Sequence, residues 1–345
     1  MASGEKTKVR VWFNHWFSTS YHIINLMKKS GYFDVYVIGS NENDTAVYRN
    51  ACDEWYTEPH GLDDGQYVDF CLRFCAEHEI DVFVPKKKML PVLKNRAKFA
   101  ENGVKIFGEE NCAAAEWTEN KQVTYERLAG VVPQAIPEYR IASSAEDFVR
   151  SFRELSRNGS RICYKLVCDE GAASFRVIDD TIESIKGLRE KPGCKITFSS
   201  ALKVLENYDF SVPLLLMPYL SGVECSADCC KLSNGNIVII PRFKTSKRYS
   251  EVRSDADIED ACRRIIAYAG FEMPVNIQFK GEGGRYYLLE VNARMSGGLP
   301  LSCLGSGVNL PALALEKLLG VRHVRAAGAD EARKVVHIET PICIQ

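Results

Sequence analysis

The chain has 345 residues, of which 46% are hydrophobic and 26% charged, so about two domains with buried cores are expected. This composition excludes the disordered, collagen-like and low-complexity classes of protein. Because 44 Lys and Arg residues face 45 Asp and Glu residues, the formal charge of -1 argues against nucleic acid and acidic membrane surfaces as partners.

Cysteine usage, histidine usage and the N-terminal residues bear on the compartment. The 13 cysteines are odd in number and include no CxxC pair, and the six histidines form no HExxH motif, so we expect reduced thiols and no zinc site. The first ten residues lack the apolar core of a secretion signal, and no stretch reaches the roughly 18 apolar residues that a membrane span needs. These features predict a cytoplasmic protein.

Residues 8–108 alternate short apolar runs with helical segments, which is the pattern of a parallel α/β layer. The expected strands are 9–13, 35–38, 81–84 and 104–107, and the expected helices are 20–30, ending at Gly31, and 65–79. The turn after the first strand, residues 14–20, has none of the glycines that let a dinucleotide approach the backbone. A nicotinamide oxidoreductase is therefore the least favoured function.

A second section begins near Cys112 and mixes helices with antiparallel strands. The expected helices are 118–128, 144–158 and an amphipathic one at 255–269 that Gly270 ends. The expected strands are 161–167, 214–217, 225–231, 237–243, a hairpin of 275–280 and 285–292 with its turn at 281–284, and a last strand at 335–339.

The segment 288–298 is the most informative, because an apolar strand presents a carboxylate, an amide and a guanidinium at alternate positions. These are Glu290, Asn292 and Arg294, and alternate residues of a strand share one face. Carboxylate and amide oxygens suit Mg²⁺, and an arginine beside them is placed to bind a phosphate. Gln278, in the preceding strand, offers a third oxygen ligand. A polar strand face open to solvent is the alternative interpretation.

The order and spacing of these residues resemble the ATP-grasp superfamily, in particular its carbamoyl phosphate synthetase-like members. In that family an acid-x-Asn-x-Arg motif follows a hairpin, and an upstream Glu, Asp or Gln completes the metal ligands, here Gln278, Glu290 and Asn292. The resemblance implies an α/β protein whose residues 1–111 form a Rossmann-like pre-ATP-grasp domain. Residues 112–345 would form a two-lobed α+β ATP-grasp domain, with the small lobe at about 130–220 and the C-terminal lobe at about 221–345.

Two lysines resemble the phosphate-contacting lysines of the family. Lys165 interrupts an apolar strand, which calls for an anionic partner, and Lys121 stands at the start of a helix. Ordinary exposed lysines are the alternative for both. The resemblance also implies that loop 168–176 closes over the phosphates, with Gly171 and Ser174 as donors, although Ser174 stands where a glycine is common.

Residues 214–224 resemble the hinge of the family, where the chain meets adenine. The resemblance assigns that contact to three residues: Met217, Tyr219 and Leu220. Glu224 would accept hydrogen bonds from the ribose hydroxyls, and Asp228 would support the site. Pro218 stands where the family often has an acidic residue. A buried strand followed by a plain turn explains the apolar residues equally well.

By the same resemblance Arg242 is a candidate for contacting the γ-phosphate. It belongs to a basic cluster with Lys244, Lys247 and Arg248, for which a solvated charged loop is the alternative. The stretch 296–307 lies where such proteins shape the pocket of the acceptor substrate, and a plain loop is its alternative.

The resemblance implies an ATP-dependent ligase that joins a carboxylate to an amine and uses Mg²⁺, with Mn²⁺ as an alternative metal. A small-molecule carboxylate would form an acyl phosphate, an amine would displace the phosphate, and Arg294, Arg242 and Lys165 would stabilise the transferred group. Two other functions stay open: a phosphotransferase that makes an acyl or carbamoyl phosphate, and a nucleotide-binding protein without catalysis. A homodimer is compatible with the family.

Overall fold

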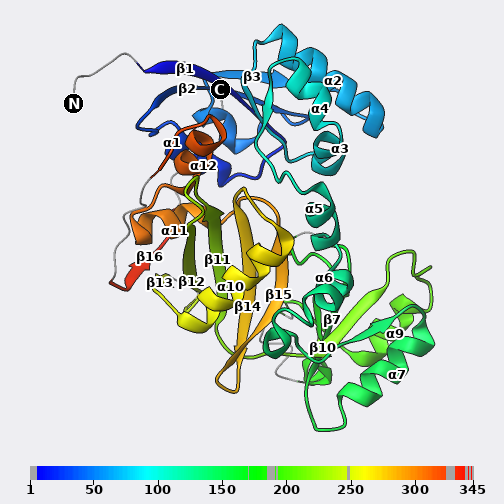
Figure 1. Cartoon of the computed structure of the whole chain (residues 1–345). Helices are drawn as coiled ribbons and strands as arrows, with labels where there is room; N and C mark the ends of the chain where they lie inside the picture. The colour runs from blue at the N-terminus through cyan, green and yellow to red at the C-terminus, as the bar shows by residue number, and fades with distance from the viewer. Residues whose placement is uncertain are drawn as a thin grey trace. The chain divides into compact units, whose positions relative to one another are not determined.

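The computed structural model describes residues 6–169, 171–184, 191, 193–246, 249–323, 331–338, 341 and 343, and it forms two compact units (Figure 1). The first unit contains Met1–Glu116, Glu224–Gln278 and Val291–Gln345. The second unit contains Trp117–Val223 and Phe279–Glu290. Among the described helices, none combines the length and hydropathy that crossing a bilayer requires.

A parallel five-stranded sheet opens the first unit, in the order β3-β2-β1-β4-β5. Its strands are β1 (Thr7–Asn14), β2 (Phe33–Asn41), β3 (Glu54–Thr57), β4 (Val82–Val84) and β5 (Lys105–Ile106). The accompanying helices are α1 (Ser20–Met27), η1 (Val47–Ala51), α2 (Asp64–Glu77), α3 (Met89–Lys94) and α4 (Arg96–Glu101). Val11 of β1 joins the core that contains α1, whereas the next residue, Trp12, stacks on Phe74 of α2, so both faces of the sheet are covered.

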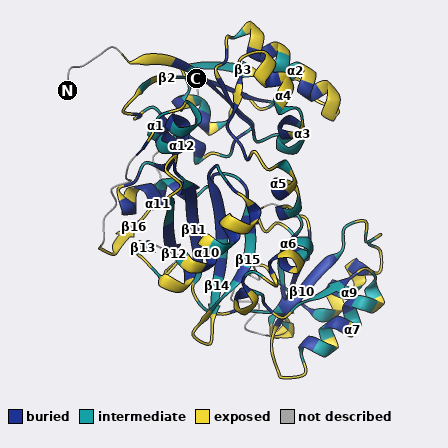
Figure 2. Ribbon diagram, in the orientation of Figure 1, coloured by how far each residue is buried: buried dark blue, intermediate teal, exposed yellow. Residues whose placement is uncertain are grey.

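A six-stranded sheet follows in the order β15-β14-β11-β12-β13-β16. Its strands are β11 (Glu224–Lys231), β12 (Ile237–Phe243), β13 (Ser250–Val252), β14 (Val275–Glu282), β15 (Arg285–Asn292) and β16 (Arg333–Val335). The helices near it are α5 (Cys112–Thr118), α10 (Ala256–Ala269), α11 (Leu299–Ser306) and α12 (Leu310–Leu318). Figure 2 shows β11 and β12 buried over most of their length, while α10 keeps an exposed outer face.

The N-terminal and C-terminal parts of the first unit share one hydrophobic core. Ile24 and Met27 of α1 and Leu310 and Leu315 of α12 belong to the same buried cluster. Glu316 of α12 accepts hydrogen bonds from the hydroxyl of Ser30 at 2.5 Å and from the backbone N–H of Gly31 at 3.0 Å. Apolar packing and a buried carboxylate therefore hold these two parts together.

The second unit is built on a mainly antiparallel sheet in the order β6-β10-β7-β8-β9. Its strands are β6 (Arg140–Ala142), β7 (Ile162–Leu166), β8 (Arg176–Ile178), β9 (Lys195–Ile196) and β10 (Leu214–Pro218). Its helices are α6 (Lys121–Leu128), η2 (Pro133–Ala135), α7 (Ala145–Leu155), η3 (Asp180–Glu183) and α9 (Phe198–Leu205). Phe148 and Leu155 of α7 pack with Leu216 of β10 and Ala201 of α9 in a separate core.

The expected α/β fold class is confirmed, and several expected element boundaries differ from the structure. Helix α1 ends at Met27, not at Gly31, because the hydroxyl of Ser30 accepts the backbone N–H groups of Tyr32 and Phe33 and turns the chain. Helix α6 begins at Lys121 rather than 118, because the side chain of Asn120 caps it. The hairpin turn is shorter than expected, since β14 continues to Glu282.

Another difference concerns the C-terminal strand, which the structure places at Arg333–Val335 rather than 335–339; Glu339 lies outside the described residues. The stretch 296–307, for which a plain loop was one interpretation, contains helix α11. The compact units also group residues differently from the expected domain order. The expected small lobe, 130–220, lies within the second unit, whereas residues 1–111 pack with most of the expected C-terminal lobe.

Candidate functional site

Within the second unit, Lys121 lies beside a carboxylate of the hairpin. Asn120 caps α6 by accepting the backbone N–H groups of Gln122 and Val123, and this cap places Lys121 at the first helical position. The Lys121 side chain is buried, its Nζ donates to the carbonyl oxygen of Asp169 at 3.0 Å, and it lies 3.9 Å from Oε2 of Glu290.

Lys165 projects from β7 toward the same hairpin. Its Nζ donates to the carbonyl oxygen of Leu289 at 3.3 Å, and no described carboxylate lies within salt-bridge distance of it. Burial, with a smaller contribution from the charge of Lys121, lowers the pKa of Lys165 to about 8, and the charges of Glu290 and Asp169 oppose this change. Because burial and the charge of Lys121 both disfavour the ammonium group of Lys165, an anion bound beside it would be favoured.

The loop after β7 is closed at its base by Ser174. The Ser174 hydroxyl donates to Oδ2 of Asp169 at 2.6 Å and accepts the backbone N–H of Leu166 at 2.9 Å. Gly171 and Ala172 follow each other with φ of 63° and 58°, a left-handed pair that costs the alanine conformational energy. The structure thus gives the Ser174 hydroxyl a local role in shaping the loop.

The hinge residues begin in β10, which contains Met217, and continue after it. Met217 and Leu220 are buried, and the backbone N–H of Tyr219 donates to the carbonyl oxygen of Arg161 at 2.7 Å. Gly222 donates its N–H to Gly281, and a Cβ on Gly222 would lie 2.2 Å from that carbonyl oxygen, so only glycine fits. In the first unit, the carboxylate of Glu224 forms an ion pair with Lys244.

Arg242 of β12 is held tightly within the first unit. Its side chain is almost fully buried, and its Nε donates to the hydroxyl of Ser302 at 3.1 Å. A Cβ on Gly298 would lie 1.9 Å from Nη2 of Arg242, so the guanidinium occupies space that any other residue at 298 would fill. Lys247 and Arg248 of the expected basic cluster lie outside the described residues.

Arg294 follows β15 and contacts the N-terminal segment of the same unit. Its guanidinium carbon lies 6.0 Å from the ring centroid of Phe17, and its Nη1 donates to the carbonyl oxygen of Met295 at 3.3 Å. The side chain also lines a cavity of about 10 Å³ with Trp16 and Met273, which is room for one water molecule at most. Sequence reasoning missed the contacts of residues 16–17 with Arg294, because no local sequence pattern indicates a contact between residues so far apart in the chain.

The three expected metal ligands lie on the two strands of the hairpin. Gln278 is on β14, and Glu290 and Asn292 are on β15, its neighbour in the sheet. The Nε2 of Gln278 donates to Oδ1 of Asn276 at 3.0 Å. No group of three or more His, Cys, Asp or Glu with metal-binding geometry occurs in the part of the chain that the structure describes. Carboxylate and amide oxygens are each ligand types that a hard cation such as Mg²⁺ accepts.

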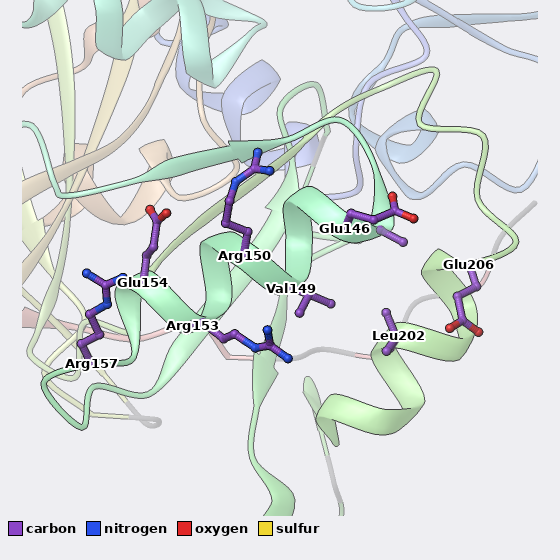
Figure 3. A pocket seen from close by; sticks show the side chains of 9 residues that line it. Glu146, Val149, Arg150, Arg153, Glu154, Arg157, Leu202 and Glu206 are labelled. Carbon is purple, nitrogen blue, oxygen red and sulfur yellow. The ribbon is translucent and has the colours of Figure 1, made fainter.

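A pocket of about 540 Å³ lies elsewhere in the second unit, between α7 and α9 (Figure 3). Both positively and negatively charged side chains line it: arginines at 150, 153 and 157 and glutamates at 146, 154 and 206. Figure 3 shows Glu146, Val149, Arg150, Arg153 and Glu154 spread along α7 and Leu202 on α9, with Arg157 and Glu206 just after the ends of these helices. None of the expected site residues lines it.

Comparisons with known proteins test the expected family resemblance. Residues 210–341 match the family model ATPgrasp_Ter, described as ATP-grasp in the biosynthetic pathway with Ter operon. The carbamoyl phosphate synthase large chain of Methanospirillum hungatei is 22% identical over 327 residues, which are 87% of this chain and 28% of that protein. The expected resemblance to the ATP-grasp superfamily is confirmed.

Solved structures show that the chain has the ATP-grasp fold over nearly its whole length. N5-carboxyaminoimidazole synthetase from Staphylococcus aureus complexed with ADP superposes with a TM-score of 0.69 at 11% identity, covering 96% of this chain and 83% of that one. The biotin carboxylase domain dimer of Hydrogenobacter thermophilus 2-oxoglutarate carboxylase, in complex with MgADP, ADP and bicarbonate, gives 0.65 at 15% identity and covers 92% and 70%. The chain spans less than a third of the length of the curated relatives it matches.

Proposed function

We propose that the protein is an ATP-dependent carboxylate–amine ligase that releases ADP and phosphate. The observation that carries this proposal is the pair of lysines, Lys121 and Lys165, which lie near the carboxylates of Glu290 and Asp169, with burial and the charge of Lys121 lowering the pKa of Lys165 to about 8. Holding two ammonium groups near each other costs free energy, and a polyphosphate would recover it. The two structural neighbours described above were solved with ADP or MgADP, which supports a nucleotide as that anion.

The chain's own residues would then bind the nucleotide as the sequence predicts. Lys121 and Lys165 would contact the phosphates, and Gly171 and Ser174 would lie in the loop over them. The backbone near Met217, Tyr219 and Leu220 would meet the adenine. Glu224 would accept hydrogen bonds from the ribose hydroxyls. Its carboxylate would then bind both the ribose and Lys244, with which it forms an ion pair.

Gln278, Glu290 and Asn292 would hold Mg²⁺, and Mn²⁺ would suit the same oxygen ligands. The metal would supply positive charge to stabilise the phosphate oxygens. Arg242 and Arg294 would add charge where the phosphoryl group is transferred, and Lys165 would add a third cation. Attack of a substrate carboxylate on the γ-phosphorus would break its bond to the ADP oxygen and give an acyl phosphate. An amine would then displace phosphate and lose a proton.

The domain roles, the substrates, the oligomeric state and the location of the protein are part of the same proposal. Residues 1–111 would serve as the pre-ATP-grasp domain, and 112–345 as the ATP-grasp domain. The substrates would be a small-molecule carboxylate and an amine, and the chain would act as a homodimer, a state supported by the dimeric biotin carboxylase domain among its structural neighbours. The thiols expected to be reduced support a cytoplasmic location.

Thermal unfolding with ligands tests the proposal directly. We expect Mg²⁺-ATP to raise the unfolding temperature, a chelator to reduce that rise, NAD to leave the temperature unchanged, and Glu290→Ala to weaken the response. Carboxylates and amines are then screened for ADP release. An ATP response without turnover for any pair would favour the non-catalytic alternative, and no ATP response would refute the proposal.

The carbamoyl phosphate synthase relatives favour one alternative, a phosphotransferase that makes an acyl or carbamoyl phosphate. Counting products separates the two. A ligase releases one free phosphate for each ADP, whereas the phosphotransferase forms ADP and retains the phosphate in its product.

A further inference from the structure

Asp228 of β11 is a buried carboxylate that accepts hydrogen bonds from three side chains of the first unit, and no described Lys, Arg or His forms an ion pair with it. Its Oδ1 accepts from the Nδ2 of Asn276 at 2.8 Å and from the hydroxyl of Ser296 at 2.7 Å. Its Oδ2 accepts from the hydroxyl of Ser302 at 2.6 Å. Only 2% of Asp228 is exposed, so these hydrogen bonds replace the water that a carboxylate would otherwise bind.

One arm of this network runs to Gln278. An ionised carboxylate only accepts hydrogen bonds, so Asn276 must turn its NH₂ group toward Asp228 and its Oδ1 away from it. That Oδ1 accepts from the Nε2 of Gln278 at 3.0 Å. The Gln278 amide is therefore oriented with its nitrogen committed to Asn276, and its Oε1 is the end left for a cation.

The other arm runs to Arg242. Because the proton of the Ser302 hydroxyl is donated to Asp228, the oxygen of Ser302 presents a lone pair, which accepts from the Nε of Arg242 at 3.1 Å. The close approach of Nη2 to Gly298 fixes the rest of the guanidinium. The Nε of Arg242 is thus occupied.

We propose that Asp228 is a positioning residue whose carboxylate sets the direction of every hydrogen bond in this network. It presents the Oε1 of Gln278 to a divalent cation through Asn276, and it orients Arg242 toward a nucleotide phosphate through Ser302. The direction of the hydrogen bonds follows from the first unit alone. The roles of the two ends rest on the proposed function.

The first experiment tests the network without any nucleotide. The side-chain NH₂ resonances of protein labelled with ¹⁵N-asparagine and ¹⁵N-glutamine are assigned with Asn276→Ala and Gln278→Ala. We expect the nearly isosteric Asp228→Asn to shift the resonances of both Asn276 and Gln278, because the new amide no longer demands a donor at each position. Unchanged resonances in a folded Asp228→Asn protein would overturn the network, whatever the protein binds.

The control for this series is Ser306→Ala. Ser306 is a buried serine of the same helix α11, and its hydroxyl donates to the carbonyl oxygen of Ser302 at 2.8 Å, outside the chain of side-chain hydrogen bonds to Asp228. We expect Ser306→Ala to change the unfolding temperature and to leave the Gln278 resonances in place. A shift as large as that of Asp228→Asn would show that general loosening, not Asp228, moves them.

The second experiment separates the two arms with Mg²⁺, ATP and ADP as probes, by calorimetric titration. We expect Asn276→Ala to raise the Mg²⁺ concentration that half-saturates ATP binding by about tenfold or more, as loss of a group behind a metal ligand does. Ser302→Ala should leave that concentration within about twofold and reduce the preference for ATP over ADP by about tenfold, since it releases Arg242. Asp228→Asn should show both changes.

The outcomes are distinguishable. If the wild-type protein binds neither nucleotide, the proposed function fails, while the resonance experiment still decides the direction of the hydrogen bonds. If the wild-type protein binds ATP and the three variants keep its Mg²⁺ dependence and its ATP preference, the positioning role is overturned. A fall in unfolding temperature alone, with both binding ratios unchanged, would show that Asp228 only stabilises the fold.

Discussion

The surroundings of Lys165 and of Asp228 satisfy their charges in opposite ways. Asp228 is buried and accepts three hydrogen bonds from neutral side chains, so nothing more is needed to hold it. Lys165 has one carbonyl oxygen as its partner, and its charge is disfavoured by burial and by Lys121. The satisfied group organises its neighbours in the absence of ligand, whereas the poorly satisfied one gains most when an anion arrives.

The largest effect is expected from Lys165→Met, which removes the charge and keeps a flexible apolar stem. Binding of Mg²⁺-ATP should weaken by about 10- to 100-fold, the value of one hydrogen bond to a charged group. The protein without ligand should become more stable by about 1 kcal/mol, because the folded state no longer holds a disfavoured ammonium group. Calorimetric titration and thermal unfolding measure the two changes.

Lys203→Met is the matched control, since Lys203 lies on the exposed side of α9. It should alter neither quantity by more than a small amount. A Lys165→Met protein that is less stable and still binds ATP normally would mean that the lysine is an ordinary structural residue.

The pH dependence of ATP binding tests whether the charge of Lys165 is as poorly satisfied without ligand as its surroundings indicate. Because the pKa of Lys165 is about 8 without ligand, half of the molecules have lost that charge at pH 8, and about nine tenths at pH 9. The phosphates favour the charged form, so ATP affinity should fall by about twofold at pH 8 and tenfold at pH 9 relative to its value at pH 7. Binding near pH 8 should take up protons from the buffer.

Lys165→Arg tests the origin of this decline, because a guanidinium stays charged throughout the range. Its ATP affinity should be nearly constant from pH 7 to pH 9. If the variant and the wild-type protein decline together, another group titrates and Lys165 is not responsible.

Local signals predicted much of the fold and few of the contacts. Helix α10 was predictable, because Asp255 caps its start and Gly270, with φ of 66°, ends it. Helix α11 was harder to see, because glycines, serines and Pro300 hide a helix whose stability comes from burial against other elements. The Lys165–Leu289 contact joins residues 124 positions apart; the apolar strand around Lys165 and the family resemblance pointed to that lysine, but neither indicated its partner. Sequence reasoning identified Asp228 as a supporting residue, but no sequence pattern indicated a role for Asn276 or Ser302.

Gly298→Ala tests the hydrogen-bonded network around Asp228, through its effect on Arg242. The backbone at Gly298 is helical, with φ of -90°, so alanine is allowed there and the fold should survive. Its Cβ would displace the guanidinium of Arg242, and we expect the preference for ATP over ADP to fall by about tenfold. Gly130→Ala is the control, because a Cβ at Gly130 meets nothing within 4 Å. An unchanged preference would show that the position of Arg242 is irrelevant to the phosphates.

The smallest effect is expected from Ser174→Ala, in the loop that the second unit places after β7. The Ser174 hydroxyl already donates to Asp169 and accepts from Leu166, so its loss should cost about 1 kcal/mol of stability. ATP affinity should fall only a few-fold, because the lysines carry the charge and the hydroxyl acts through the loop. A loss as large as that of Lys165→Met would instead mean that Ser174 leaves Asp169 and binds phosphate itself. In that case the loop must rearrange around the nucleotide. The loop would then resemble the surroundings of Lys165, which depend on a ligand, rather than the preformed network around Asp228.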